Sequence, residues 1–464
     1  MNMTESKSDF VNENNMSLLT DFYELTMCAA YFGNRMEESA TFDLFIRRLP
    51  QNRSYFVFAG LEQALRYLRN IRFNGEQIDY LSAEGFKPEF LNYLRTFRFT
   101  GEVYAVPEGT IVFPDEPLIR VTAPIIEAQL VETFLLNTIN IQTTIATKAS
   151  RVVTAAHGRP VIEFGLRRTQ GTDAGMKAAR SSYLAGCNGT SNVLAGMRYG
   201  IPVFGTMAHS YIMFHGTEQE AFKAFAEAFP DNSTFLIDTY DDLAGAENAA
   251  TIAKQMEKQG YRLKAVRIDS GNLVVISKKI RAILDKHGLN YVKIFATGDL
   301  DECKVASLIK NGAQIDSFGV GTRMSTSNDR PYVDVVYKLA GKEEKGKFIP
   351  AMKLSKDKIT LPGKKQVFRQ KDSKGNYARD IIALEHESIQ GEPLLQKVIE
   401  KGNMLDNHPS LEEIRKTALD NLSKLPNRYK RLRNAPKYPV ILSPELKRIR
   451  STLMEQPRKT ERAT

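Results

Sequence analysis

The fold is first indicated by an apolar segment that turns polar at its end, Pro202-Val203-Phe204-Gly205-Thr206-Met207-Ala208-His209. Its length and apolar composition predict a buried strand. Other segments before and after it repeat the pattern and also end in Arg, Asp, Ser, Thr or Gly. Polar residues at the ends of successive buried strands are typical of the active-site face of an α/β barrel.

The predicted strands alternate with helical segments, which favours right-handed parallel βαβ units. Seven strands can be counted, at residues 161–164, 189–193, 203–207, 235–237, 264–268, 292–296 and 315–320. An eighth strand is not obvious. We therefore predict an α/β fold with an irregular α/β barrel, for which seven strands is the best count.

Antiparallel strand patterns lie on both sides of the barrel segment, and we expect them to form one composite α+β domain. The expected division has five parts. These are a disordered N-terminus at 1–15, an N-terminal α+β segment at 16–125, the barrel at 126–331, a β-rich segment at 332–423 that completes the N-terminal domain, and a basic tail at 424–464.

The formal net charge of +10 is concentrated in residues 424–464, which carry twelve Lys or Arg against three Glu. The rest of the chain is close to neutral, and this argues against nucleic acid as a partner of the whole protein. The tail itself is expected to be a solvated segment packed loosely on the body, and a nucleic-acid-binding arm is the alternative.

Membrane and secretory classes are disfavoured by the sequence. No apolar run reaches the roughly 18 residues that a membrane span needs. The N-terminus lacks the basic start and apolar centre of a secretory signal. The three cysteines lie far apart without metal-ligand spacing. A sparse, odd cysteine count fits a reducing compartment, so we expect a cytoplasmic protein.

The residues at the strand ends restrict the chemistry. The sequence contains no Gly-x-Ser-x-Gly elbow, no His/Cys metal spacing and no Walker-type loop. One histidine, His209, remains with carboxylates such as Asp238 and Asp269, arginines and Gly-rich turns, a set that suits an anionic, phosphate-bearing substrate with Mg²⁺. Taken singly, His209 could be structural and Asp269 a helix cap, but seven strand ends with the same polar bias favour a site.

Five strings in this order resemble the nicotinate phosphoribosyltransferase family: TDFYELTM at 20–27, EFGLRR at 163–168, GTMAHS at 205–210, RIDSG at 267–271 and FGVGT at 318–322. The resemblance implies that nicotinate displaces pyrophosphate from 5-phosphoribosyl 1-pyrophosphate to give nicotinate mononucleotide. It also implies ATP hydrolysis coupled through a transiently phosphorylated His209, the use of Mg²⁺, and a homodimer with shared active sites.

The same resemblance assigns roles to individual residues. The flat nicotinate ring is expected between Phe164 and a tyrosine of the neighbouring subunit, which matches Tyr23. Asp238 is expected to orient His209, and Asp269 to bind ribose hydroxyls, directly or through Mg²⁺. The further nicotinate contacts are Arg167, Ser191, Thr206 and Arg267. The expected phosphate contacts are Arg47, Gly298, Asp299, Gly319, Gly321, Thr322, Lys353 and Lys364.

Three alternative functions are weighed against this one. The related nicotinamide enzyme carries an aspartate where Ser191 stands, and an aspartate would repel a carboxylate, so serine favours the acid substrate. A non-catalytic sensor of pyridine nucleotides would lack the strand-end groups. A phosphate-binding barrel aldolase or isomerase would need a lysine or a glutamate base at a strand end, for which Glu163 is the one candidate.

Overall fold

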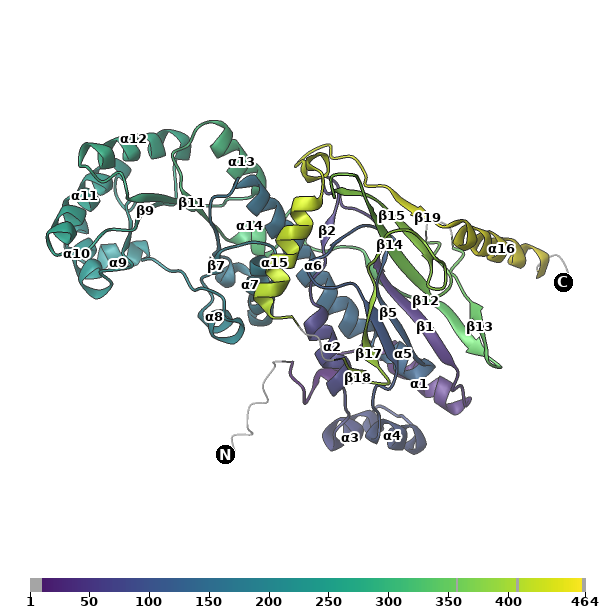
Figure 1. The fold of residues 1–464 in the computed structure, drawn as a ribbon. Helices are drawn as coiled ribbons and strands as arrows, with labels where there is room; N and C mark the ends of the chain where they lie inside the picture. Colours follow the sequence, from purple (N-terminus) through teal and green to yellow (C-terminus); the bar gives the residue numbers. More distant parts are fainter. Residues whose placement is uncertain (1–10, 356–357, 406–408, 461–464) are drawn as a thin grey trace, which may run out of the picture. The chain divides into compact units, whose positions relative to one another are not determined.

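The computed structural model describes residues 11–355, 358–405 and 409–460, with side chains up to Glu455. The chain forms two compact units (Figure 1). Residues 145–331 make one, which we call the half-barrel unit, and residues 1–144 with 332–464 make the other, which we call the sheet unit. In the described part of the chain, no helix is long and apolar enough to cross a membrane.

A six-stranded sheet in the order β7-β6-β11-β10-β9-β8 forms the centre of the half-barrel unit. All its pairings are parallel, as the alternation of strands and helices predicted. The strands are β6 (Val161–Glu163), β7 (Gly189–Thr190), β8 (Thr234–Leu236), β9 (Ala265–Ile268), β10 (Lys293–Ala296) and β11 (Ser317–Val320). Because parallel strands share one direction, their carboxyl ends meet at the same edge of the sheet.

The prediction of a strand at 203–207 is wrong in the described structure. Val203 forms only an isolated parallel bridge with Thr190, and the residues after it, up to Ala208, have no regular structure. The amide of Phe204 still donates to the Thr190 carbonyl at 2.9 Å. The chain then leaves the sheet and enters a helix at His209. The sheet order contains no pairing between β8 and β7, so the parallel sheet is curled but open, a half-barrel.

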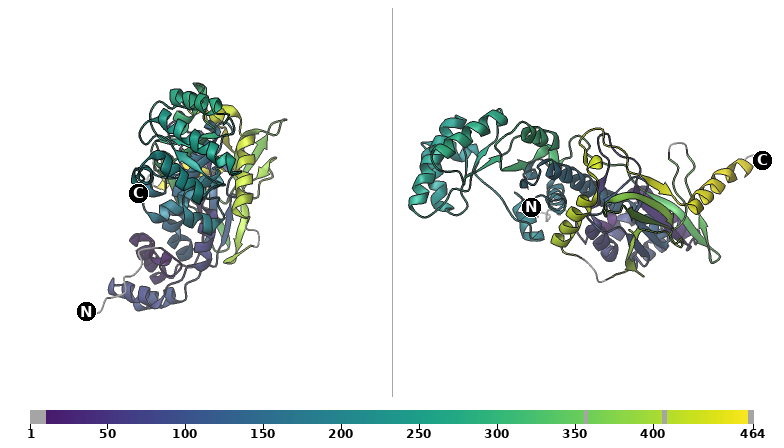
Figure 2. Two further views of the ribbon diagram at one scale, coloured as in Figure 1. Left: turned by 90° about the vertical axis from the view of Figure 1, so that its left-hand side faces the viewer. Right: turned by 45° about the horizontal axis from the view of Figure 1, so that its top comes forward.

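Helices follow the strands of the half-barrel unit, and α10, α11 and α12 lie side by side along it (Figures 1 and 2). Side-chain caps begin several of them: Asp241 caps α11 and Asn272 caps α12, as their residue types favour. The helices are η2 (Leu166–Arg168), α7 (Thr172–Leu184), α8 (Val193–Tyr199), α9 (His209–Phe214), α10 (Glu218–Ala228), α11 (Asp242–Lys258), α12 (Leu273–Lys286), α13 (Glu302–Lys310) and α14 (Thr322–Ser325).

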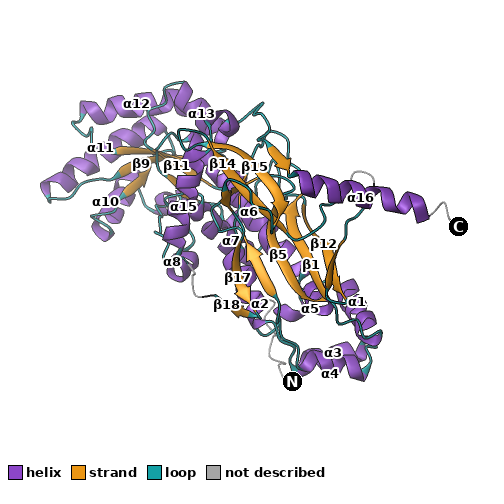
Figure 3. Ribbon diagram, turned by 45° about the vertical axis from the view of Figure 1, so that its right-hand side comes forward, coloured by secondary structure: helices purple, strands orange, loops and turns teal. Residues whose placement is uncertain are grey.

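The sheet unit is built on a seven-stranded sheet in the order β13-β12-β1-β5-β3-β17-β18. Its strands come from both ends of the chain: β1 (Ser39–Ile46), β3 (Glu102–Ala105), β5 (Pro117–Pro124), β12 (Val335–Glu344), β13 (Lys347–Pro350), β17 (Gln396–Glu400) and β18 (Asn403–Met404). Strand β1 pairs antiparallel with both β5 and β12. Figure 3 shows these long strands with α5 (Ile125–Leu130) beside them.

Helices complete the large apolar core of the sheet unit, to which residues such as Leu44, Leu65 and Phe90 contribute. They are η1 (Met16–Leu18), α1 (Phe22–Gly33), α2 (Leu61–Asn70), α3 (Gly75–Ala83), α4 (Pro88–Arg95) and α15 (Leu411–Lys424). Helix α6 (Glu132–Ala155) runs across the boundary between the two units at residues 144 and 145. Of the N-terminus expected to be disordered, residues 1–10 lie outside the described residues, and Asn12 to Asn15 form a turn.

The C-terminal segment is part of the fold rather than a loosely packed tail. Strand β19 (Val440–Leu442) pairs with β15 (Tyr377–Leu384) in a four-stranded sheet, in the order β16-β14-β15-β19, that also holds β14 (Lys365–Lys371) and β16 (Glu392–Pro393). Tyr429 in η3 (Asn427–Lys430) and Tyr438 are buried, because their rings pack together and Tyr438 stacks on Phe113. Helix α16 (Pro444–Thr460) follows, and β2 (Phe56–Val57) pairs with β4 (Ile111–Val112).

Candidate active site

A cavity of about 280 Å³ lies at the carboxyl ends of β6, β9, β10 and β11. Its lining comes from strand ends and the turns that follow them, the places where the sequence pattern predicted functional residues. We call it the strand-end cavity. It is lined by Phe164, Arg167, Arg168, Arg267, Asp269, Thr297, Gly298, Asp299, Gly319, Gly321 and Thr322.

Arg267 of β9 is held in the strand-end cavity by three neighbours. Its Nε donates to Thr297 Oγ1 at 2.9 Å, and its Nη1 donates to Thr206 Oγ1 at 2.9 Å. Its Nη2 lies 3.1 Å from Asp269 Oδ1. Its guanidinium carbon also lies 6.0 Å from the centre of the Phe164 ring. These contacts fix the plane of a cation that a carboxylate can approach edge-on.

The hydroxyl of Thr297 joins Arg267 to Asp269. It accepts from Arg267 and donates to Asp269 Oδ1, and its side chain is buried at the end of β10. Burial opposes the ionisation of Asp269, but the hydrogen bond from Thr297 and the charge of Arg267 outweigh it and lower the pKa of this carboxyl. Asp269 is therefore a carboxylate at neutral pH.

Asp238 and His209 lie beside this group but do not form the pair expected from the sequence. His209 Nδ1 is hydrogen-bonded to Thr239 Oγ1 at 3.1 Å. Asp238 Oδ2 instead accepts from the Asp269 amide and from Ser270 Oγ, both at 2.8 Å. In this structure Thr239, and not Asp238 as expected, contacts His209. The Asp238 carboxylate is instead engaged by the turn after β9.

Two glycines allow neighbouring groups to approach the backbone closely at the strand ends. A Cβ on Gly319 would lie 2.6 Å from Thr297 Cγ2 and 2.9 Å from the Phe164 ring. Gly298 has a φ of +96°, and a side chain there would collide with the Asp269 carbonyl. Phe164 itself packs edge-to-face on Phe295, with 5.5 Å between ring centres. The glycines thus leave one wall of the strand-end cavity as bare backbone, which an oxyanion can approach closely.

A second ion pair lies at the rim of the strand-end cavity. Arg323 binds both oxygens of Asp299 at 2.6 Å, and Lys304 lies 3.0 Å from Asp299 Oδ2. The hydrogen bonds from Arg323, together with Lys304, lower the pKa of Asp299 to about 2. Asp299, which was expected among the phosphate contacts, is therefore a carboxylate whose charge these cations already offset.

Glu163 supports the neighbouring strand ends from within the core. Its side chain accepts hydrogen bonds from Thr190 Oγ1 at 2.6 Å and from the Gly165 amide. Burial raises the pKa of Glu163 against these two hydrogen bonds. The amide of Ser191 donates to the Glu163 carbonyl at 2.9 Å. Ser191, half-buried, is thus fixed beside β6, at the end of β7.

Four of the residues expected at the site belong to the sheet unit. Tyr23 lies on α1 with 48% of its surface exposed, and burial of its hydroxyl, followed by the charge of Glu132, raises its pKa. Arg47 follows β1 and is half-buried. Lys353 is exposed. Lys364 pairs with Glu343 at 3.6 Å and lies 5.3 Å from the Phe348 ring centre.

Sequence reasoning missed Thr239, Thr297 and Arg323 as individual site residues. Thr297 directly precedes Gly298 and Asp299, which were expected at the site, but its role depends on which side chains of β9 it meets. Arg323 lies one residue after the expected phosphate turn, and its contact with Asp299 joins α14 to the turn after β10. No spacing in the sequence signals a contact between two such distant segments. Among the described residues, no three Asp, Glu, His or Cys side chains are grouped so that they could hold a metal ion by themselves.

Comparison with protein families gives one consistent result. The nicotinate phosphoribosyltransferase N-terminal domain matches residues 18–140, the nicotinate phosphoribosyltransferase family matches residues 160–384, and the nicotinate phosphoribosyltransferase C-terminal domain matches residues 388–450. These three matches together span most of the chain.

Individual proteins agree with this result. Nicotinate phosphoribosyltransferase pncB2 of Mycobacterium tuberculosis is 45% identical over 92% of this chain and 91% of its own length. The nicotinate phosphoribosyltransferase of Bacillus subtilis is 40% identical over 93% of this chain and 94% of its own. The crystal structure of human nicotinic acid phosphoribosyltransferase superposes with a TM-score of 0.83 and 30% identity, covering 94% of this chain and 100% of that one.

Proposed function

This chain belongs to the nicotinate phosphoribosyltransferase family, and we propose that its strand-end cavity is where nicotinate takes the phosphoribosyl group. The activity of the family, phosphoribosyl transfer to nicotinate in NAD biosynthesis, is the function of the chain. The observation that carries the assignment of the site is the Arg267 guanidinium, held by Thr206, Thr297 and Asp269 beside the Phe164 ring.

Nicotinate is a flat ring with one carboxylate, and Arg267 and Phe164 suit those two parts. The Arg267 guanidinium binds the carboxylate through charge-assisted hydrogen bonds. The Phe164 ring covers one face of the pyridine. A pyridine nitrogen carries a lone pair at neutral pH, so it attacks the anomeric carbon without a base. Ser191 and Thr206 complete the nicotinate contacts, and Arg167 at the rim attracts the anion.

The phosphates of 5-phosphoribosyl 1-pyrophosphate fit the glycine wall. The backbone around Gly298, Gly319 and Gly321, with Thr322, offers N–H and hydroxyl donors that side chains do not block. The C1–O bond to pyrophosphate breaks as the new C1–N bond forms, and positive charge develops on the ribose ring. The ionised Asp269 supplies negative charge and accepts from the ribose hydroxyls. Arg47, Lys353 and Lys364 of the sheet unit are further candidates for the phosphates.

ATP coupling is proposed to pass through His209. Nδ1 of this ring is engaged with Thr239, so Nε2 is the nitrogen that accepts a phosphoryl group. When Nδ1–H donates to the Thr239 hydroxyl, Nε2 carries the lone pair that attacks the γ-phosphorus. The P–O bond to ADP breaks and an N–P bond forms. Water later cleaves the N–P bond and releases phosphate.

Magnesium is expected with the pyrophosphate, and the carboxylates present fit such a role. Mg²⁺ bound to substrate phosphates needs only one or two protein carboxylates. Asp238 Oδ1 is buried without a hydrogen-bond partner among the described residues, so it is a free oxygen ligand, and Asp269 lies next to it. When bound, Mg²⁺ neutralises the charge of the leaving pyrophosphate.

A homodimer with shared sites is supported by exposed apolar residues. Tyr23 and Phe22 expose about half of their surface on α1, and α8 exposes Val193, Leu194 and Met197, the last by 79%. Apolar groups exposed in this way typically mark protein interfaces. The tyrosine of one subunit then covers the nicotinate face that Phe164 leaves open in the other. The expected domain division and cytoplasmic location remain predictions from the sequence.

One assay tests these proposals together. The protein is mixed with nicotinate, 5-phosphoribosyl 1-pyrophosphate, Mg²⁺ and ATP, and nicotinate mononucleotide and acid-labile phosphate on the protein are measured. Arg267→Met is expected to abolish product at ordinary nicotinate concentrations, with Arg262→Met, an exposed arginine of the same unit outside the cavity, as the matched control. His209→Ala is expected to lose the stimulation by ATP. A His209→Ala protein that ATP still stimulates would refute the phosphohistidine.

A further inference from the structure

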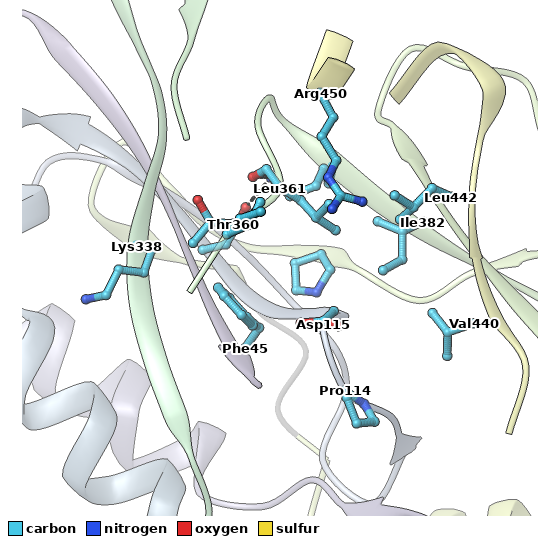
Figure 4. Close-up of a pocket in the computed structure, with 14 residues that line it drawn as sticks. Phe45, Pro114, Asp115, Lys338, Thr360, Leu361, Ile382, Val440, Leu442 and Arg450 are labelled. Carbon is cyan, nitrogen blue, oxygen red and sulfur yellow. Dashed lines mark hydrogen bonds and ion pairs between the residues drawn. The ribbon is translucent and has the colours of Figure 1, made fainter. Parts of the chain in front are cut away.

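A second cavity, of about 250 Å³, lies wholly within the sheet unit (Figure 4). Strand β1 supplies Asp43 and Phe45, and β15 and β19 supply Ile382, Val440 and Leu442. The remaining wall comes from Pro114, Asp115, Pro117, Lys338, Ile359, Thr360, Leu361, Lys365 and Arg450, the last on α16. We call it the Arg450 cavity. None of the residues assigned to the phosphoribosyl transfer lines it.

Most of the wall of the Arg450 cavity is apolar. Phe45, Leu361, Ile382 and Leu442 point toward it in Figure 4, and Pro114 and Pro117 also line it. Its size is below that of sites for drug-sized molecules. The cavity therefore suits a compact molecule with an apolar body of a few carbon atoms or one ring.

Arg450 brings an unmatched cation to this apolar space. Its side chain points from α16 between Leu361 and Ile382 (Figure 4). Its Nε is buried and has no hydrogen-bond partner among the described residues. Asp115 interacts with it through charge, but no ion pair between the two is found in the described part of the chain. A buried guanidinium N–H without an acceptor is costly, so the position favours an added anion.

Asp43 supplies a free acceptor on the same cavity. The Asp43 side chain is 3% exposed, and Lys365 Nζ lies 2.6 Å from its Oδ2. The other two protons of Lys365 reach the carbonyls of Leu361 and Gly363, each at 2.7 Å. Asp43 Oδ1 has no hydrogen-bond partner among the described residues. A ligand O–H or N–H would satisfy it.

We propose that the Arg450 cavity is a second ligand site, which takes a small monocarboxylic acid with an apolar body and one O–H or N–H donor. Arg450 binds the carboxylate, Asp43 Oδ1 accepts from the donor, and the body packs between Phe45, Leu361 and Leu442. Two carboxylates, Asp43 and Asp115, and two lysines, Lys338 and Lys365, also line the cavity. Lys365 is paired with Asp43 and Lys338 with Glu132, so the cation left for an added anion is Arg450, which suits a single negative charge. Because the ligand joins α16 to β1 and β19, its binding stabilises the fold.

Titration calorimetry on the full-length protein tests this site with 4-hydroxyphenylacetate, which has one carboxylate and one donor. Binding is expected at millimolar concentration or below, with a rise in melting temperature. 4-Hydroxyphenylacetamide lacks the charge and phenylacetate lacks the donor. Each should bind about tenfold more weakly than 4-hydroxyphenylacetate. No binding at millimolar concentration, or equal binding of the neutral amide, overturns the proposal without any variant.

Variants locate the binding. Arg450→Met is expected to weaken it about tenfold or more while phosphoribosyl transfer is unchanged. The matched control is Arg448→Met, on the same helix and with a side chain 72% exposed, which should bind normally. Arg267→Met should lose nicotinate yet keep the probe, which separates this site from the strand-end cavity. Normal binding to a folded Arg450→Met protein, or equal loss in Arg448→Met, overturns the proposal.

Discussion

Thr297 shows how one hydroxyl can set the geometry of two charged side chains in a site. It holds the Arg267 guanidinium at 2.9 Å and also donates to Asp269. Thr297→Val keeps the shape of the side chain and removes both hydrogen bonds. Since hydrogen bonds to charged groups contribute about 1.5–3 kcal/mol, we expect kcat/KM for nicotinate to fall roughly ten- to a hundredfold.

The control for this prediction is Thr297→Ser, which retains the hydroxyl and should keep most of the activity. The kcat/KM of both variants, which retain Arg267, is compared with that of the native protein by steady-state kinetics. A purely structural effect would lower the melting temperature of Thr297→Val and leave the kinetics of the surviving enzyme unchanged. That result would exclude a positioning role for Thr297.

Ser191 is proposed to favour nicotinate over nicotinamide. It is half-buried at the end of β7, and its backbone is fixed by the Glu163 carbonyl. Ser191→Asp adds a charge that repels the substrate carboxylate, so the KM for nicotinate should rise at least tenfold, whereas Ser191→Ala should change it little. Competition between labelled nicotinate and nicotinamide measures the shift. Equal effects of the two substitutions on nicotinate would rule out this role of Ser191.

Individual residue types could be predicted at the strand ends, but their partners could not. Arg267, Asp269 and Gly319 stand in strings whose chemistry suits an anion, and the structure brings them to one cavity. The partner of His209 was expected to be Asp238 and is Thr239, the next residue in the chain. Successive residues after a strand point to different sides, so the choice depends on the turn geometry that the sequence pattern does not specify.

At the scale of elements, helix α1 contains a carboxyl whose titration affects stability. Glu24 is buried and accepts from Thr20 at 2.7 Å and from Thr133 of α6 at 2.8 Å. Burial raises its pKa from 4.5 to about 7 against these two hydrogen bonds. The folded state therefore binds the Glu24 proton more tightly than the unfolded state.

When a carboxyl has a higher pKa in the folded state, its protonation contributes stability. This contribution is fully present below the pKa of the unfolded state and is lost as the pH rises through the pKa of the folded state. For Glu24 the window runs from 4.5 to about 7, and the change is on the order of 3 kcal/mol. Glu24→Gln removes this contribution, so the melting temperature of the native chain relative to the variant should fall across the window. Calorimetry of both proteins at several pH values measures it. A constant difference would contradict the prediction.

The elements also show which strands a hydrophobic pattern can predict. The six parallel strands were predictable because each is a short apolar run bounded by turns. The run at 203–207 has the same composition but forms only a bridge at Val203, since it lies at an edge where no further strand pairs with it. The basic C-terminal segment was misjudged for the opposite reason. Its many charged residues predicted a solvated segment, but Tyr429 and Tyr438 are buried and β19 pairs with β15 of the sheet unit.

For the whole molecule, the division into two units depends on contacts distant in sequence. Strand β1 pairs with β12, nearly 300 residues later in the chain. Alternating patterns in both segments suggested one composite domain, but periodicity does not specify which strands pair. The half-barrel unit was easier to predict, because neighbouring strands in its sheet are mostly close in the sequence and its connections have one allowed hand.

The proposed sharing of sites between subunits gives a prediction for the whole molecule. Tyr23→Ala and Arg267→Met should each inactivate their own homodimer. If the nicotinate site takes Tyr23 from one subunit and Arg267 from the other, each mixed dimer regains one intact site. Random pairing makes half of the dimers mixed, so co-expression should restore up to about a quarter of the native activity.

Co-expression of the two variants with different affinity tags, followed by purification through both, isolates the mixed dimers for assay. The matched control pairs Arg267→Met with Thr206→Ala, two changes within one half-barrel unit, where Arg267 donates to Thr206. Thr206→Ala is also expected to inactivate its own homodimer. Because Thr206 and Arg267 of one site come from the same chain, each half-barrel unit of this mixed dimer carries one of the two changes, and the control should stay inactive. No activity in the Tyr23 pair would show that each chain builds its own complete site, and activity in the control would show that Arg267 and Thr206 do not act together from one chain.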